Sequence, residues 1–188
     1  MNFFAEEDMI PIGYMAKNIM AKPDWLKVDN VDDIYSVSGC MSNMFTDYID
    51  YWKHNGYWMF NEPDIIIQIA KENKIDTSNI KFFFYEIYEK QYSDEYNAWE
   101  EFKPEESFAT KVKQPINKKC LGYDITSFSA QTMPECSPLS CNGLAQEINV
   151  NEHCLLSSLE DAIQLLELGK FTNCEPGPYR ILAVYEFS

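Results

Sequence analysis

Residues 80–88, Ile-Lys-Phe-Phe-Phe-Tyr-Glu-Ile-Tyr, are the segment that most constrains how this chain can fold. Aromatic and β-branched side chains dominate the segment, and both kinds favour strands. Successive side chains of a strand point to opposite faces, and residues 82–85 are apolar at every position. The strand therefore predicts either a sheet that is covered on both faces or a sheet with one face that meets a partner.

Helices and further strands are predicted on both sides of this segment. Amphipathic spacing predicts helices over residues 42–52, 61–73, 94–102 and 159–168, with a short helical turn over 141–148. Asn61 is the expected cap of the second helix, and Ser157 or Ser158 caps the fourth, which Gly169 ends. Strands are predicted over residues 10–16, 34–38, 57–60, 122–128, 154–156 and 179–187. This mixture indicates an α+β protein.

The order of these elements is similar in two parts of the chain. Residues 57–88 and 153–187 each predict a short strand, a capped helix, a loop and a long strand flanked by aromatic residues. We therefore expect two similar β-α-β-containing halves, packed as one compact globular unit with a mixed or antiparallel sheet. The halves are residues 1–102 and 120–188, and the charged, proline-containing segment 103–119 connects them. Two unrelated α/β segments would give the same pattern by coincidence.

The net charge excludes some classes of partner. The chain has 15 basic and 30 acidic side chains, which gives a formal charge of −15. Such a charge repels phosphate backbones and anionic lipid surfaces, so binding to nucleic acid or to a membrane is not expected. The leading hypothesis is an acidic protein-interaction module, such as an inhibitor or immunity-type protein that binds a basic protein partner. A charge of this sign also serves solubility alone.

The N-terminus and the cysteines indicate a compartment. Residues 1–8 are acidic and lack the basic and apolar regions of a signal peptide. No apolar run reaches the length of a membrane span. We expect a cytoplasmic chain with reduced cysteines.

Aromatic residues and a single arginine are the candidate binding residues. Tyr51, Trp52, Tyr57 and Trp58 lie close together among acidic residues, and tyrosine and tryptophan dominate protein interfaces. Such residues also fill cores. Arg180 is the only arginine of the chain, and it suits either contact with an anion or a buried ion pair.

The cysteines are the candidates for covalent chemistry. Five of the six lie in one stretch, at positions 120, 136, 141, 154 and 174. Cys141 is placed at a predicted helix start, where the helix dipole lowers a thiol pKa. A small thiol-dependent enzyme would then use Cys141 as nucleophile, His153 as base and Glu152 to orient the base. Cys136 is the alternative nucleophile, and His54 the alternative base.

The same cysteines allow three other interpretations. Cys136, Cys141, Cys154 and Cys174 provide enough thiolates for a zinc-stabilised domain without catalysis, although their spacing is not that of a zinc knuckle. Cys136 and Cys141 are also close enough in sequence for a redox pair. Packing as small apolar residues is the commonest role of free cysteine and needs no site. Apart from zinc, no cofactor is expected, because nucleotide-binding and metalloprotease motifs are absent from the sequence.

Overall fold

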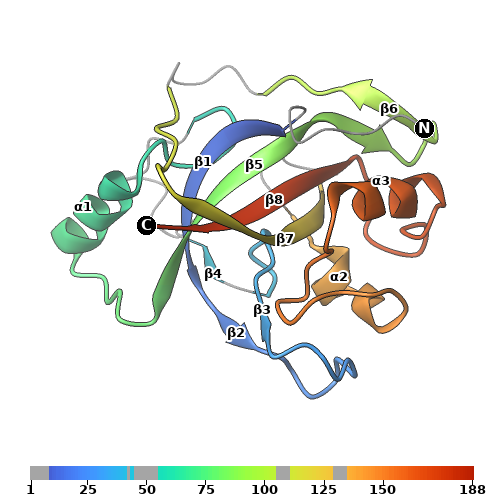
Figure 1. Cartoon of the computed structure of the whole chain (residues 1–188), viewed down its shortest axis with the longest axis horizontal. Coiled ribbons are helices and arrows are strands. Elements are labelled where there is room, and N and C mark those ends of the chain that lie inside the picture. Colours follow the sequence, from blue (N-terminus) through green and yellow to red (C-terminus); the bar gives the residue numbers. More distant parts are fainter. Residues whose placement is uncertain (1–8, 42, 45–54, 105–110, 129–134) are drawn as a thin grey trace.

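The structure is a computed structural model that describes residues 9–41, 43–44, 55–104, 111–128 and 135–188. An antiparallel sheet dominates it (Figure 1). The strand order is β4 (Asn43–Met44), β1 (Met9–Asn18), β5 (Ile80–Ser93), β8 (Tyr179–Phe187) and β7 (Lys118–Ser127). A sixth strand, β6 (Ala98–Glu101), pairs with the end of β5. The short strands β2 (Met20–Ala21) and β3 (Asp33–Ile34) form a separate pair.

The α+β class is therefore confirmed, and the sheet pairings within the described residues are antiparallel. The two central strands, β5 and β8, come from opposite sides of the predicted boundary at residues 103–119. The expected strand over 34–38 is reduced to β3, and β5 and β7 are longer than expected. The helix expected over 42–52 falls almost entirely outside the described residues.

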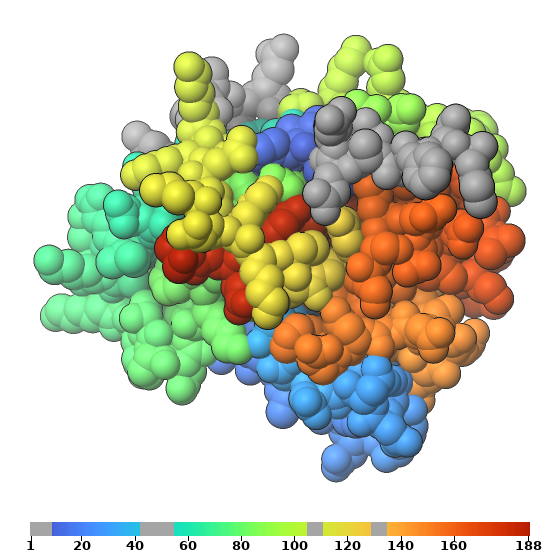
Figure 2. Space-filling model, viewed as in Figure 1, coloured from blue at the N-terminus to red at the C-terminus, as the bar shows by residue number. Residues whose placement is uncertain are grey.

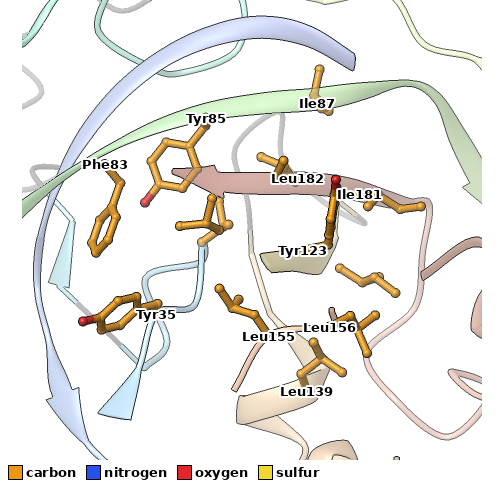
Figure 3. Packing of buried hydrophobic residues seen from close by; sticks show 14 of the residues in the cluster. Tyr35, Phe83, Tyr85, Ile87, Tyr123, Leu139, Leu155, Leu156, Ile181 and Leu182 are labelled. Atoms are coloured by element: carbon orange, nitrogen blue, oxygen red, sulfur yellow. The ribbon is translucent and has the colours of Figure 1, made fainter. Parts of the chain in front are cut away.

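Both faces of β5 are covered within the fold. Phe83, Phe84 and Tyr85 are all buried. Phe83 and Tyr85 point toward the layer that contains Tyr35 (Figure 3), and the ring centroids of Phe83 and Tyr35 lie 5.1 Å apart. Phe84 lies on the other face, with its centroid 5.1 Å from that of Tyr14. The first of the two alternatives predicted for this strand is correct.

The longer helices begin and end near the predicted positions. α1 spans Pro63–Asn73 and α3 spans Leu159–Glu167. Ser158 caps α3, because its hydroxyl oxygen accepts the Asp161 N–H at 3.0 Å. Asn61 does not cap α1, whose N-cap is Glu62; the Asn61 side-chain oxygen instead accepts from Asn55 at 3.1 Å. Within the described residues, no helix is long and apolar enough to span a bilayer.

The helix expected over residues 94–102 is wrong, because this segment forms a turn and then β6. Trp99 explains the difference. Its ring packs edge-on against Tyr88 and Tyr92, with centroids 5.4 and 5.1 Å away. These aromatic contacts between paired strands stabilise an extended segment.

A loop at residues 55–60 attaches to β1 through its first residue. The Asn55 side-chain oxygen accepts the N–H groups of Tyr57 at 3.0 Å and Met59 at 3.2 Å. Its amide nitrogen donates to the Ile12 carbonyl at 2.7 Å. Phe60 then pairs with Tyr14 of β1. One buried asparagine thus satisfies backbone groups that would otherwise lack partners.

A loop at residues 151–156 attaches to β7 in the same way. The Asn151 side-chain oxygen accepts the N–H groups of His153 at 3.0 Å and Leu155 at 3.1 Å. Its amide nitrogen donates to the Leu121 carbonyl at 2.6 Å. Leu156 then pairs with Tyr123 of β7.

Glycine is required where these two loops press on the strands. Gly13 and Gly122 have φ values of +126° and +143°. A Cβ atom on Gly13 would lie 2.3 Å from the Phe60 carbonyl oxygen, and one on Gly122 would lie 2.7 Å from that of Leu156. Each position combines an unfavourable φ with a clash against backbone.

We therefore predict that Gly122→Ala lowers the free energy of unfolding by more than about 2 kcal/mol, since strain and overpacking add. Gly13→Ala should cost at least as much. The control is Gly169→Ala, where φ is +67° and the nearest contact is 3.4 Å away; its expected cost is only about 1 kcal/mol. Urea unfolding of the three variants measures these values, and equal costs at all three positions would contradict the prediction.

Candidate functional site

Three cysteines from two segments that are distant in the sequence meet beside the sheet. The Sγ atoms of Cys40, Cys136 and Cys141 all lie within 4.8 Å of one another. Cys40 follows β3, Cys136 follows β7, and Cys141 ends the short helix α2 (Pro138–Cys141). Cys136 is buried, Cys141 is partly buried and Cys40 is exposed. We call these three residues the thiol cluster.

The cluster lies where two segments of the chain are held together. Figure 2 shows the segment that contains β2 and β3 (blue) against the segment with α2 and the 3₁₀ turn η3 (Leu144–Gln146; orange). The Lys27 N–H donates to the Gln146 side-chain oxygen at 3.2 Å. The Asp32 N–H donates to the Glu152 carbonyl at 2.9 Å.

Two buried charges hold the loop that leads to Cys40. Lys17 of β1 and Asp124 of β7 are both about 1% exposed. The Lys17 ammonium donates to the carbonyls of residues 36–38, at 3.0 Å for Ser36 and 3.1 Å for Ser38. From the other side, Asp124 accepts the N–H of Val37 at 2.7 Å.

Ser137 connects this loop to the cysteines. Its hydroxyl donates to Asp124 at 2.6 Å and accepts the Ser38 N–H at 3.2 Å. Ser137 precedes α2 as its N-cap residue, but its hydroxyl makes no cap bond, because it is turned toward Asp124. Cys136 is the preceding residue, so one hydroxyl fixes the position of both cysteine segments. We call the set of Lys17, Asp124, Ser137 and residues 36–38 the charged frame.

Burial shifts the pKa values of both charges in the frame. Burial removes water from the ammonium group and so lowers the pKa of Lys17 to about 7, although the charge of nearby Asp124 acts to raise it. Burial likewise raises the pKa of Asp124 to about 6, while the Ser137 hydroxyl and the Val37 N–H act to lower it.

Cys141 is the most acidic thiol of the cluster. Its pKa falls to about 6, first because the Cys136 thiol donates to its sulfur. The Ser137 backbone N–H and the Cys40 thiol add to the effect, and burial opposes it. The Ser38 hydroxyl lies 4.0 Å from the sulfur. Cys141 is the last residue of α2, so these hydrogen bonds, rather than the predicted helix start, stabilise its thiolate.

The other two thiols of the cluster keep their protons. The pKa of Cys136 rises well above its ordinary range, first because its thiol donates a hydrogen bond to the Cys141 sulfur, and burial adds to the effect. The Asn142 side-chain oxygen, 3.5 Å from the Cys136 sulfur, is another acceptor for this thiol. Burial and the charge of Cys141 raise the pKa of Cys40, whose thiol donates to the Glu135 carbonyl at 2.9 Å. The cluster is therefore one thiolate flanked by two thiols.

His153, the predicted base, lies beside β3. Its Nδ1 atom is 2.8 Å from the Asp33 carboxylate, and its ring stacks on Tyr35 with centroids 4.0 Å apart. Glu152, the predicted orienting residue, lies 4.0 Å from the other ring nitrogen. The structure thus brings His153 together with Asp33, and Cys141 together with Cys136. His54 lies outside the described residues.

The remaining predicted ligands lie apart from the thiol cluster. Cys154 is buried with φ +61°, and burial raises its pKa to about 12. Burial also raises the pKa of Cys174. Neither belongs to the group of three sulfurs. Cys120 is exposed, and all six cysteines are free thiols.

The predicted aromatic binding set is only partly described, since Tyr51 and Trp52 lie outside the described residues. Tyr57 and Trp58 are half-buried in the loop at 55–60, and Tyr57 packs against Phe102. The Arg180 guanidinium lies between the rings of Phe102 and Phe128, 3.4 and 3.9 Å from their centroids. Such stacking is a common structural role of arginine.

Arg180 also has hydrogen-bond partners on the sheet. Its Nε and Nη2 atoms donate to the Gln91 side-chain oxygen at 3.3 and 3.2 Å. Burial lowers the pKa of Arg180 to about 10. These contacts hold the Arg180 side chain against the sheet. None of the described ion pairs includes Arg180.

A groove of about 330 Å³ lies between α3 and residues 147–149. Leu165 and Leu168 are among its apolar lining residues, and Leu168 is 70% exposed. Glu147 and Asp161 provide carboxylates at the same groove. The groove therefore combines an apolar surface with negative charge.

Sequence reasoning missed Cys40, Lys17 and Asp124. Cys40 lies outside the cysteine-rich stretch and reaches the cluster only because the charged frame fixes residues 36–38. The available signal was a charged residue in the buried part of each of two strands, Lys17 in β1 and Asp124 in β7. A buried charge needs hydrogen-bond partners, and the backbone groups of residues 36–38 supply them to both side chains.

Comparison with known proteins gives no match for this chain. No family model, no curated protein and no solved structure resembles it at a significant level.

The charged frame predicts a pH dependence of stability. The pKa of Asp124 is 3.8 ordinarily and about 6 in the folded protein. Between these two pH values the folded state holds a proton that the unfolded state has lost. The contribution of Asp124 to the free energy of unfolding therefore falls as pH rises from about 4 to 6. Lys17 has an ordinary pKa of 10.5 and about 7 when folded, so its contribution rises from pH 7 toward 10.

Asp124→Asn should therefore remove the fall between pH 4 and 6, and Lys17→Met should remove the rise above pH 7. Unfolding by urea across this pH range measures both slopes. Lys119→Met is the control, because Lys119 forms an exposed ion pair with Glu186. If Lys17→Met leaves the alkaline slope unchanged, the assignment to Lys17 is wrong.

Proposed function

We propose that the protein acts through the Cys141 thiolate in thiol–disulfide exchange, with Cys136 as the second thiol. The observation that carries the proposal is the set of donors around the Cys141 sulfur, which lowers its pKa to about 6. With that pKa, roughly nine in ten molecules hold the thiolate at pH 7. The thiolate is the nucleophilic form of cysteine, and its reactivity is greatest when the pKa lies near the ambient pH.

The proposed reaction has two steps. The Cys141 thiolate attacks one sulfur of a substrate disulfide, forming a mixed disulfide and releasing the other substrate sulfur as a thiolate. Cys136 then passes its proton to the released substrate thiolate and attacks the Cys141 sulfur, which breaks the mixed disulfide and expels the remaining substrate sulfur as a thiolate. The products are a Cys136–Cys141 disulfide, one substrate thiol and one substrate thiolate, so the substrate is reduced by two electrons and the protein is oxidised by two.

The position of Cys136 suits the second step. In the resting protein its pKa is high, first because its thiol donates a hydrogen bond to the Cys141 thiolate and then because it is buried. Once Cys141 is part of a mixed disulfide, that negative charge is gone and the main cause of the high pKa disappears. Cys136 thus becomes a better nucleophile only after the first step. No separate base is required, so the proposal gives His153 and Glu152 no catalytic role.

We predict that Cys141 is the fastest of the six cysteines to react with iodoacetamide at pH 7, and that its rate rises to half-maximum near pH 6. Cys136→Ser retains a donor and should preserve this behaviour. Cys136→Ala removes the donor and should move the half-maximum toward the ordinary thiol pKa of 9. Peptide mapping by mass spectrometry measures the rates, with exposed Cys120 as the internal control. Uniform slow labelling would refute a low-pKa Cys141.

Exchange itself is tested with oxidised glutathione. The unmodified protein should form the Cys136–Cys141 disulfide, whereas Cys136→Ser should accumulate glutathione on Cys141. Glutathione retained at a cysteine outside the cluster would contradict the proposed order of steps.

The acidic groove favours a second candidate function, the binding of a basic protein partner. The net charge of −15 supports association with a positive surface. Glu147 and Asp161 line the groove together with Leu165 and Leu168, so a partner that presents basic and apolar side chains together would suit it. An inhibitor or immunity-type protein of the cytoplasm would use such a surface, and this remains a proposal.

This candidate predicts that a captured basic partner binds less tightly as salt increases, because exposed charges are screened. The double variant Glu147→Lys/Asp161→Lys should weaken its binding at least tenfold by calorimetry. Glu72→Lys, a charge reversal on the exposed surface of α1, is the control and should have little effect. Affinity that is insensitive to salt and to the double variant would exclude this groove.

The expected similarity of the two halves also remains a proposal. It is supported by Asn55 and Asn151, which make equivalent hydrogen bonds to β1 and β7. Trp58 and Cys154, three residues later in each loop, share a φ of +61°. α1 and α3 both begin eight residues after the asparagine. Cys40 comes after β1 in the chain, whereas Cys136 and Cys141 come after β7. If the halves are equivalent, each half therefore contributes to the thiol cluster.

A further inference from the structure

We propose that Cys40, Cys136 and Cys141 together bind one thiophilic metal ion, of which Zn²⁺ is the expected one. The proposal concerns the same thiols as the proposed exchange reaction, but it depends on a different observation, which is the position of Cys40. An exchange pair needs only Cys136 and Cys141. A third sulfur at similar distance comes from a segment almost one hundred residues earlier, and neither step of that reaction forms a bond to it.

The sulfur positions are close to those of a metal site. The three Sγ atoms lie within 4.8 Å of one another. A Zn–S bond of about 2.3 Å places the sulfurs of a tetrahedral site about 3.8 Å apart. Each pair therefore needs to approach by at most about 1 Å, which rotation of the cysteine side chains can supply.

The charge of the site also suits a metal. Metal ligands must be thiolates, so the ion replaces the protons of the three cysteines. Three thiolates and one Zn²⁺ leave a single negative charge, and the buried Lys17 side chain donates to the carbonyls of the loop that leads to Cys40.

The ligand set indicates which ion binds and how. Sulfur-only ligands favour Zn²⁺ or Cu⁺ over Mg²⁺ or Ca²⁺, which prefer oxygen. Among the described residues, no fourth cysteine, histidine or carboxylate joins the group. A tetrahedral ion held by these three cysteines would keep one position open, and Cys40 is exposed at the protein surface. Three protein ligands with one open position are typical of an exchangeable or catalytic ion rather than a closed structural one.

The charged frame positions this site in advance. It fixes residues 36–38 against Asp124 and Ser137, and Cys40 follows two residues later. The ligands are thus brought together by the fold before an ion arrives. We therefore expect the fold to persist without metal, and binding to add stability rather than to create the structure.

The test uses reduced, metal-free protein under anaerobic conditions, titrated with Co²⁺ and separately with Zn²⁺. One equivalent of Co²⁺ should produce thiolate-to-cobalt charge-transfer absorption, and Zn²⁺ should displace it. Calorimetry in buffers of different ionisation enthalpy should show the release of protons on binding, because the ion replaces thiol protons.

Variants identify the ligands. Cys40→Ser, Cys136→Ser and Cys141→Ser should each lower the affinity at least about 100-fold, since even loss of an outer-shell partner costs 10–100-fold. Cys120→Ser and Cys174→Ser are matched controls outside the cluster and should bind as the unmodified chain does. Circular dichroism confirms that each variant is folded. If Cys40→Ser binds Co²⁺ normally, or if no stoichiometric absorption appears, the metal site is refuted. A tight complex with Cu⁺ but not Zn²⁺ would overturn the assignment of the ion.

The two proposals fail separately. Cys40→Ser removes a metal ligand but leaves the Cys136–Cys141 pair, so it should abolish cobalt absorption and still form the disulfide with oxidised glutathione. Absence of metal binding with intact exchange refutes this inference alone. Metal binding without exchange refutes the proposed reaction alone.

Discussion

The contact between a buried lysine, a buried aspartate and the backbone loop between them is the interaction on which the rest of the site depends. Lys17 and Asp124 lie on strands at opposite sides of the central pair β5–β8, and their side chains point to the same face of the sheet. The loop at residues 36–38 places three carbonyls on the ammonium and one N–H on the carboxylate. The two side chains form no direct ion pair among the described ones, so each depends on these backbone groups, and loss of such a partner from a buried charge costs at least about 1–3 kcal/mol.

These two buried charges add little net stability, because their hydrogen bonds barely offset the cost of removing each charge from water. The main effect of the two charges is to fix the position of the loop at residues 36–38. An apolar pair of similar volume would cover the sheet equally well, but it would not orient carbonyls and an N–H group. The directional bonds determine where the loop turns, and with it where Cys40 lies relative to Cys136 and Cys141.

The sequence predicted the elements well where one local pattern decides them. Residues 80–88 are apolar at consecutive positions, and the strand is central and covered on both faces. Ser158, one of the two predicted N-caps of α3, was correct because a cap also depends on a few neighbouring residues, whereas the predicted cap of α1 at Asn61 was wrong. The segment around Trp99 was not predicted, because cross-strand packing with Tyr88 and Tyr92 outweighed its helical spacing.

The site was only half predictable. Cys136 and Cys141 were found from their proximity in the sequence. Cys40 could not be found in that way, because its place depends on hydrogen bonds across the whole sheet. The thiol pKa of Cys141 was predicted to fall through a helix start, whereas hydrogen bonds from Cys136 and Ser137 lower it. A spacing pattern cannot reveal which donors surround a sulfur.

The strand order has a consequence for how the chain folds. β8 follows the other strands in the sequence, yet it lies between β5 and β7 in the sheet. During synthesis one edge of β5 stays unpaired until β8 has been made. β7 likewise has no neighbouring strand in the sheet before β8 is made. Pairings between such distant segments form slowly. A ribosome-bound intermediate would expose two unpaired strand edges, and that intermediate is the species on which a chaperone would be expected to act.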